Sequence, residues 1–243
     1  MKEYEILGVK IDGLTTGEVL DFIESKIKQN KSAQIATVNN EFIVEALNNK
    51  KFKDVLNSCD LNTIDSTGVK WAIRKKYKEN PERLPGSDLF LDICRFSAER
   101  GYRIFLLGSQ SGVGTLAAQK MIKMFKGLHV VGVNEGKVID ENKIEPALID
   151  EINSSNADIV FVALGAPRQD LWISNNIKKL KPAVCIGIGG TLDYVSGKVK
   201  RAPKAWRSLG LEWLYRFFMQ PKRFTRILKA VVVFPLMVIF NPD

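Results

Sequence analysis

The chain has 243 residues, of which 45% are hydrophobic, and it carries a formal net charge of +9. Its length suits one large α/β domain with an appendage, or two small domains, and its apolar fraction is ordinary for a globular protein. Because it has one histidine and three widely spaced cysteines, the composition argues against a histidine-based triad, a multi-histidine metal centre and a CxxC metal site. We expect the cysteines to be reduced thiols of a cytosolic protein.

Short apolar runs alternate with helix-compatible stretches along the first 190 residues. Thr15 and Glu18 have the spacing of a capping box and predict a helix that continues to Asn30. Apolar runs predict buried strands at residues 35–38, 103–108, 129–133, 158–165 and 183–190. Helical spacing predicts helices at residues 41–49, 66–78, 87–100, 113–125, 140–153 and 168–179. The alternation predicts an α/β fold with a Rossmann-like parallel sheet and helices on both faces.

In such a sheet, ligands bind beyond the carboxyl ends of the strands. Glycine or small polar residues follow each apolar run, and turn formation alone would explain any single one of them. Because several strand ends carry them, we predict that they line one site. The candidates are Thr37, Asn39, Asp65, Gly108, Ser109, Asn134, Gly165, Gln169, Gly189, Gly190, Thr191 and Asp193.

The standard phosphate-binding motifs are missing from the sequence. There is no GxxxxGK[ST], and the glycines at 108–114 do not form GxGxxG, which argues against a dinucleotide-dependent oxidoreductase. Backbone N–H groups of glycine turns can still bind phosphate, and Gly108–Ser109 and Gly189–Thr191 are the candidates. The sequence also lacks DxD, a pair of carboxylates that can hold a metal ion on a bound diphosphate, and we expect no metal. If a diphosphate were the leaving group, its charge would need another source of positive charge.

Asp65 is the most informative carboxylate, because it follows the apolar run LNTI and precedes Ser-Thr-Gly. One interpretation makes it the N-cap of the helix that begins near Ser66. The other makes it a general base at a strand end, which would contribute about 10²–10⁴ in rate. The two roles do not exclude each other.

The basic residues are concentrated after residue 197. From Lys198 onward there are ten basic and two acidic residues, a net charge of +8 out of +9 for the whole chain. This charge lies beside aromatic residues and the apolar run 230–240, which favours an anionic membrane surface over nucleic acid as the partner of residues 198–240. We therefore predict an α/β core at 1–196 and a helical, membrane-associating appendage at 197–243.

The arginines of the appendage have two interpretations. Arg216, Arg223 and Arg226 could bind a diphosphate through their guanidinium groups, or they could only attract anionic lipid. The aromatic residues among them fit a membrane interface, packing on the domain, or a contact in a homo-oligomer.

The sequence contains no segment long enough to span a membrane. The apolar run 230–240 has 11 residues and includes Pro235, so as a helix it would cover about half of the hydrocarbon core. The N-terminal residues lack the apolar segment of a signal peptide. We expect a cytoplasmic protein that is peripheral on the inner face of the membrane.

Seven motifs, in order, closely resemble the WecG/TagA/CpsF glycosyltransferases. They are TVNN at 37–40, DSTG at 65–68, RLPGSD at 83–88, VALGAPRQ at 162–169, GGTLD at 189–193, GKVKRAP at 197–203 and LEWLYR at 211–216. The family usually has Asp-Gly-x-Gly where this chain has Ser66, which makes the identity of the acceptor less certain than the type of reaction.

The resemblance implies an inverting transferase that needs no metal or other cofactor. Such enzymes move a sugar from a UDP-sugar to a polyprenyl-diphosphate-linked sugar at the inner membrane face. In one branch the sugar is N-acetylmannosamine and the acceptor is N-acetylglucosaminyl-diphosphoundecaprenol, in wall teichoic acid synthesis. By resemblance, Asp65 is the base, Thr37 and Asn39 lie beside the sugar, Gln169 lies in the pocket, and the appendage arginines meet the diphosphate.

Three alternatives remain open from the sequence. The chain could be a non-catalytic, membrane-docked module that binds a nucleotide. It could be a family member that uses another donor, such as UDP-N-acetylmannosaminuronic acid. A cytosolic dehydrogenase is the third, and the missing GxGxxG argues against it.

Overall fold

The computed structural model describes residues 2–135, 145–181, 183–203, 206, 214–215 and 228–241. The strands are β1 (Lys2–Ile6), β2 (Val9–Gly13), β3 (Ala33–Val38), β4 (Leu61–Ile64), β5 (Arg103–Gly108), β6 (His129–Asn134), β7 (Ile159–Ala163) and β8 (Val184–Gly187). The helices are α1 (Thr16–Lys28), α2 (Asn40–Asn48), α3 (Lys50–Ser58), α4 (Thr67–Tyr77), α5 (Gly86–Arg100), α6 (Val113–Met124), α7 (Pro146–Ser154), α8 (Arg168–Asn176), α9 (Thr191–Ser196), the π-helix η2 (Lys229–Val233) and α13 (Phe234–Phe240).

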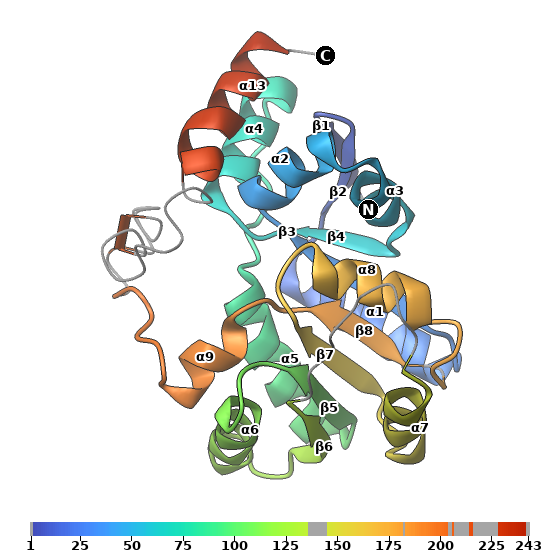
Figure 1. Ribbon diagram of the computed structural model, residues 1–243. Helices are drawn as coiled ribbons and strands as arrows, with labels where there is room; N and C mark the ends of the chain where they lie inside the picture. Colours follow the sequence, from blue (N-terminus) through green and yellow to red (C-terminus); the bar gives the residue numbers. More distant parts are fainter. Residues whose placement is uncertain are drawn as a thin grey trace.

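The predicted α/β fold is confirmed. Among the described residues, β3 to β8 form a parallel sheet of six strands in the order β4-β3-β8-β7-β5-β6, with helices on both faces (Figure 1). The five predicted strands are all present, and the sixth, β4, is the apolar run that precedes Asp65. The capping box of α1 is also present, with both Thr15 and Glu18 bonded as the motif requires.

Alternate residues of the strands enter apolar clusters on opposite faces of the sheet, as a covered parallel sheet requires. Ile35 of β3 packs in a cluster that includes residues of α1, α5 and α6. Its neighbour Ala36 packs in a second cluster with residues of α2, α3 and α4. Val160 and Val162 of β7 belong to a third cluster with α7 and α8. The sheet is therefore buried on both sides, and its open positions are the strand ends.

The direction in which successive strands are added to the sheet reverses after β3 and β4. The chain passes from β3 to its neighbour β4, and then crosses to β5 on the other side of the sheet. A crevice forms at such a point beyond the carboxyl ends of the strands, because the adjoining connections run to opposite sides. The candidate site lies here.

The N-terminal hairpin was not predicted from the sequence. Strands β1 and β2 pair antiparallel, and the turn between them places Leu7 at φ 53° and Gly8 at φ 75°. Asn62 at the start of the sheet ties the hairpin down, because its backbone N–H donates to Asp12 and its amide to the carbonyl of Lys10.

The C-terminal helix packs on the α/β core. The segment formed by η2 and α13 lies against α2 and α4, at the end of the molecule shown in red in Figure 1. Phe234 is fully buried and Val238 is 7% exposed in the cluster of α2 and α4. The predicted boundary at residue 197 stays a prediction. Among the described residues, no helix combines the length and apolarity that crossing a bilayer would need.

Candidate active site

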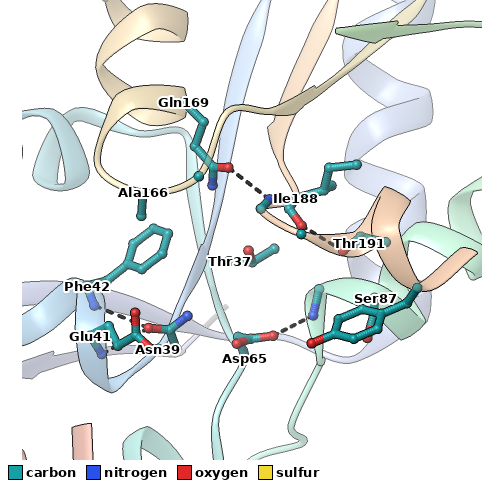
Figure 2. A pocket seen from close by; sticks show the side chains of 15 residues that line it. Thr37, Asn39, Glu41, Phe42, Asp65, Ser87, Ala166, Gln169, Ile188 and Thr191 are labelled. Atoms are coloured by element: carbon teal, nitrogen blue, oxygen red, sulfur yellow. Dashed lines mark hydrogen bonds between the residues drawn. The ribbon is translucent and has the colours of Figure 1, made fainter. Parts of the chain in front are cut away.

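A pocket lies at the carboxyl ends of β3, β4, β7 and β8, closed on one side by the start of α5. Figure 2 shows it with the side chains that line it. Polar side chains and glycines predominate among its residues. These are Thr37, Asn39, Glu41, Phe42, Asp65, Gly86, Ser87, Gly165, Ala166, Gln169, Ile188, Gly189, Gly190, Thr191 and Tyr194.

Asp65 reaches this pocket from the end of β4. Its Oδ1 accepts a 2.6 Å hydrogen bond from the backbone N–H of Gly86, the first residue of α5. Ser66, not Asp65, is the N-cap of α4, because the Ser66 hydroxyl accepts from the N–H of Val69. The interpretation of Asp65 as that N-cap is therefore wrong. Its carboxylate is held against a helix N-terminus, where backbone N–H groups stabilise negative charge.

Thr37 and Asn39 lie on the floor and one wall of the pocket, at the end of β3. The Thr37 hydroxyl donates to the carbonyl of Gly187 at 3.0 Å, so its oxygen keeps lone pairs for a ligand. Asn39 is the N-cap of α2, and its amide oxygen accepts from the N–H groups of Glu41 and Phe42. Capping thus uses the amide oxygen of Asn39, and Figure 2 shows the amide nitrogen on the pocket side.

Gln169 joins the turns that follow β7 and β8. It is 1% exposed, and its Oε1 accepts a 2.8 Å hydrogen bond from the N–H of Gly189. Gly187 allows this packing, because a Cβ there would lie 2.5 Å from the Gln169 Nε2 and 2.9 Å from Asp170. Gln169 therefore fixes the glycine turn that borders the pocket.

Asp170 is a carboxylate that sequence reasoning missed. Its side chain is fully buried directly after Gln169, and burial raises its pKa to about 7, although the Gln169 amide offsets part of this effect. A buried carboxyl with this pKa binds a proton more readily than an exposed one near neutral pH. It does not line the pocket itself, and it packs behind Gln169 and Gly187.

Three predicted site residues lie at the ends of two other strands, β5 and β6. Gly108 ends β5, Ser109 follows it and Asn134 ends β6, and none of them lines the pocket. Gly108 is required by packing, because a Cβ there would lie 2.9 Å from the carbonyl oxygen of Ala163. The amide of Asn134 donates to Glu151. Their role in nucleotide binding stays a prediction.

The helix N-terminus beside Gly108 is occupied by a side chain of the protein. The Glu135 carboxylate accepts from the N–H groups of Gly112 and Thr115 at the start of α6, and these bonds lower its pKa. A phosphate that bound at this helix end would have to displace Glu135. Of the two glycine turns, only Gly189–Thr191 borders the pocket.

Several pocket residues come from helices and were missed because the strand-end rule does not reach them. Glu41 and Phe42 lie in the first turn of α2, Ser87 in that of α5 and Tyr194 in α9. Asp193, which was predicted, lies next to Tyr194 but outside the pocket lining. Glu41 is a second carboxylate in the pocket lining, besides Asp65. The sequence signal that could have found Glu41 is its position directly after the polar turn of β3.

Arg216, Arg223 and Arg226 lie outside the described residues, but the chain on either side of them is placed. Before them, Arg201 forms a 2.6 Å ion pair with Asp88 of α5, one residue after the pocket residue Ser87. Arg201, which precedes the three arginines in the sequence, is therefore held beside one wall of the pocket.

A second contact near the pocket involves Ala230 of η2. The Asn40 amide nitrogen donates to the carbonyl of Ala230 at 2.7 Å, and Asn40 directly follows the pocket residue Asn39. Ala230, which follows the three arginines in the sequence, is thus also held close to the pocket.

Among the described residues, no group of three or more His, Cys, Asp and Glu side chains is placed to hold a metal ion. The Arg83 guanidinium donates to the backbone carbonyl of Asp65 at 3.5 Å. This arginine belongs to the RLPGSD motif.

Matches to known proteins extend over most of the chain. The model of the "Glycosyl transferase WecG/TagA/CpsF family" matches residues 4–242, which include the whole pocket and the C-terminal helix. The chain is also 33% identical over 221 residues to an N-acetylglucosaminyldiphosphoundecaprenol N-acetyl-beta-D-mannosaminyltransferase of Bacillus spizizenii. That alignment covers 86% of this chain and 84% of the relative.

Proposed function

Because the chain belongs to the WecG/TagA/CpsF family of glycosyltransferases, we propose that it transfers N-acetylmannosamine from a UDP-sugar to N-acetylglucosaminyl-diphosphoundecaprenol. The name of the Bacillus spizizenii relative gives this sugar and this acceptor, and the two chains align over most of their lengths. The product would serve wall teichoic acid or related cell-surface polysaccharide synthesis. The observation that carries the proposal is a polar pocket at the strand ends, with Asp65 in its wall, in a chain of this family.

Asp65 is the general base of the proposed reaction. A carboxylate has lone pairs on both oxygens, so the bond from Gly86 can fix its orientation while it accepts a proton from the acceptor hydroxyl. As that proton moves to Asp65, the hydroxyl oxygen attacks the anomeric carbon of the donor sugar. The bond from this carbon to the UDP oxygen breaks, UDP leaves with the electron pair, and the anomeric configuration inverts.

The remaining pocket residues bind the donor. Thr37 and the amide nitrogen of Asn39 face the space beside Asp65 and suit the hydroxyl and acetamido groups of a sugar. Gln169 holds the turn of Gly189, over which the diphosphate would lie. The nucleotide would extend across the strand ends toward the predicted contacts that lie outside the pocket: Gly108, Ser109, Asn134 and Asp193.

The positive charge for the leaving diphosphate comes from the appendage. Arg216, Arg223 and Arg226 lie in the sequence between Arg201 and Ala230, which contact Asp88 and Asn40 close to the pocket. A guanidinium that meets the diphosphate stabilises the charge that grows as the glycosidic bond breaks. This arrangement does the work of a divalent cation, so we propose that the reaction needs no metal.

The surface formed by α4 and α13 suits an anionic membrane. On α13, Leu236, Ile239 and Phe240 are 47%, 44% and 75% exposed. The adjacent helix α4 has three basic residues in its last turn and an exposed Trp71. Apolar and tryptophan side chains enter the membrane interface, and each basic residue near an anionic surface adds about 1 kcal/mol. We propose that this surface holds the enzyme on the inner face of the membrane, where its lipid-linked acceptor would lie, and that residues 197–243 act as the appendage.

One assay tests the proposed reaction and its donor. The full-length protein is added to phospholipid vesicles that contain a polyprenyl-diphosphate-linked N-acetylglucosamine. Separate samples receive UDP-N-acetylmannosamine, UDP-N-acetylmannosaminuronic acid, UDP-N-acetylglucosamine or UDP-glucose. Free UDP and the lipid-linked disaccharide are quantified by mass spectrometry.

We expect the disaccharide and an equal amount of UDP with UDP-N-acetylmannosamine, at a rate at least tenfold above the other donors. A preference for the uronic acid would correct the donor and retain the reaction type. Binding of UDP-sugars without any disaccharide would overturn the proposal in favour of a non-catalytic nucleotide-binding module.

A further inference from the structure

The side chain of Asn40 joins three segments that are far apart in the sequence. Its amide nitrogen donates to the carbonyl of Ala230 in η2 at 2.7 Å. Its amide oxygen accepts a 2.6 Å hydrogen bond from the hydroxyl of Ser66. Asn40 directly follows Asn39, and Ser66 directly follows Asp65, so both turns that carry these pocket residues meet at this amide.

The local sequence explains why the Ala230 carbonyl needs a partner from outside its helix. In a π-helix, the carbonyl of residue i accepts from the N–H of residue i+5. For Ala230 in η2, that residue is Pro235, which has no N–H. A carbonyl that is removed from water without a hydrogen bond costs free energy, and the Asn40 amide supplies the missing donor.

The neighbouring residues Gly68 and Ser66 fit the position of the Asn40 amide. Gly68 leaves room for it, because a Cβ at that position would collide with the Asn40 amide. Ser66 accepts from the N–H of Val69 while it donates to Asn40, so its hydroxyl is engaged in both directions. Ser66 stands where the family usually has glycine. In this chain it therefore serves the bond to Asn40 and the cap of α4, and it does not line the pocket.

We infer that Asn40 is a positioning residue, which fixes the C-terminal helix to the two turns that carry Asn39 and Asp65. Through Ala230 it fixes the start of the C-terminal helical segment beside the turn that carries Asn39. It also sets the orientation of α13, whose exposed apolar residues would face the membrane. This catalytic consequence rests on the proposed function, whereas the attachment of the helix does not.

Two substitutions separate the donor role of Asn40 from its acceptor role. Asn40→Ala removes both hydrogen bonds. Asn40→Asp has the same shape and still accepts from Ser66, but it places a carboxylate oxygen against the Ala230 carbonyl. The matched control is Asn57→Ala, because Asn57 also bridges to a distant segment: its amide donates to the Gly8 carbonyl of the hairpin and its oxygen accepts from Lys10.

Hydrogen–deuterium exchange with mass spectrometry measures the attachment directly. We expect both Asn40 variants to exchange at least fivefold faster than the unsubstituted protein in residues 228–241, with no change in residues 2–13. Asn57→Ala should show the opposite pattern. Ser66→Gly should accelerate exchange in 228–241 by a smaller factor. Unchanged exchange in Asn40→Asp, with thermal unfolding showing an intact fold, overturns the inference.

Kinetics with vesicle-bound acceptor tests the consequence for the site. Because Asn40 does not line the pocket, the Kd of the UDP-sugar should stay within twofold in both Asn40 variants, while kcat falls at least fivefold. Faster exchange with unchanged kcat would show that the attachment does not position the site. An unsubstituted protein without transferase activity, but with the expected exchange pattern, would refute the proposed function and leave the attachment of the helix standing.

Discussion

The backbone N–H of Gly86 and the carboxylate of Asp65 are joined by a 2.6 Å hydrogen bond, which ties the end of β4 to the start of α5. The bond comes from a backbone that the α5 helix holds rigid, so the carboxylate has one orientation toward the pocket. A positioned base needs this property, because proton transfer requires hydrogen-bond contact with the acceptor hydroxyl.

Asp65→Asn tests the base directly. Asparagine keeps an oxygen for the Gly86 N–H but cannot accept a proton at neutral pH, so kcat should fall about 10²–10⁴-fold with little change in thermal stability. Asp54→Asn, at an exposed position of α3, is the control and should retain full activity. Turnover of Asp65→Asn within a factor of three of the unsubstituted enzyme would remove Asp65 from this role.

Gly187→Ala tests the packing that fixes Gln169. A methyl group at residue 187 would lie 2.5 Å from the Gln169 amide nitrogen, so we expect a loss of about 1–3 kcal/mol in the free energy of unfolding and weaker UDP-sugar binding. The control is Gly17→Ala in the first turn of α1, where a Cβ meets nothing within 4 Å. It should stabilise the protein by about 0.5 kcal/mol. Equal urea midpoints for the two variants would contradict the packing described for Gln169.

Asp170 should make stability fall as pH rises toward neutrality. Burial raises the pKa of its carboxyl to about 7 in the folded protein, from 3.8 for an exposed aspartic acid. Between about pH 4 and pH 7 the folded state therefore binds a proton that the unfolded state has lost. At low pH the Asp170 carboxyl is protonated, so the folded state buries no charge there. The free energy of unfolding falls as pH rises from about 4 to 7, because the folded state must then bury a carboxylate.

Asp170→Asn should remove this part of the pH dependence, because it never carries the charge. We expect the free energy of unfolding of the variant to be higher than that of the unsubstituted protein at pH 8, by an amount on the order of 4 kcal/mol. At pH 5 the difference should be much smaller. Urea unfolding at the two pH values measures both differences. The same gain at pH 5 and pH 8 would show that proton binding by Asp170 is not the cause.

Phe240→Asp tests our proposal that the exposed side of α13 faces the membrane. Phe240 is 75% exposed, so the substitution should leave the fold intact while a charge replaces an apolar side chain at the membrane. We expect sedimentation with phosphatidylglycerol vesicles to weaken at least tenfold. The control is Ile122→Asp, because Ile122 is 47% exposed on α6, away from α4 and α13 (Figure 1). Equal loss in the two variants would point to a non-specific effect of charge.

Removal of divalent metals should leave the reaction intact. The proposed guanidinium groups stay charged at any working pH and are not extracted by EDTA. We expect the initial rate in the presence of excess EDTA to stay within about twofold of the untreated rate. Loss of activity that Mg²⁺ or Mn²⁺ restores would place a metal, rather than the appendage arginines, at the diphosphate.

The apolar strands could be predicted because a parallel sheet is buried on both faces and leaves continuous apolar runs. The hairpin was missed for a physical reason: its turn uses Leu7 at a positive φ, whereas such turns usually carry Asn or Asp before Gly. Helix α3 was missed because one residue, Asn49, ends α2 and also caps α3, so the sequence shows no loop between them.

The site was predicted in part, because the strand-end rule identifies positions along the chain but not the order of strands in the sheet. Thr37, Asn39, Asp65 and Gln169 meet because β4, β3, β8 and β7 are neighbours. Gly108 and Asn134 follow equally good strand patterns, but β6 is the edge strand and β5 lies between β6 and β7, outside the four strands that carry the pocket. Strand order depends on crossover connections between distant segments, which periodicity does not report.

The burial of Phe234 has a kinetic consequence. This side chain completes an apolar cluster in which most other members, such as Val69, lie more than a hundred residues earlier in the chain. Contacts across so long a loop close late in folding, because the entropy of closure is lost before the contact gains anything. Weakening them would speed unfolding more than it would slow folding. The helix that would bring the enzyme to its lipid is therefore the part whose detachment would govern the lifetime of the native state.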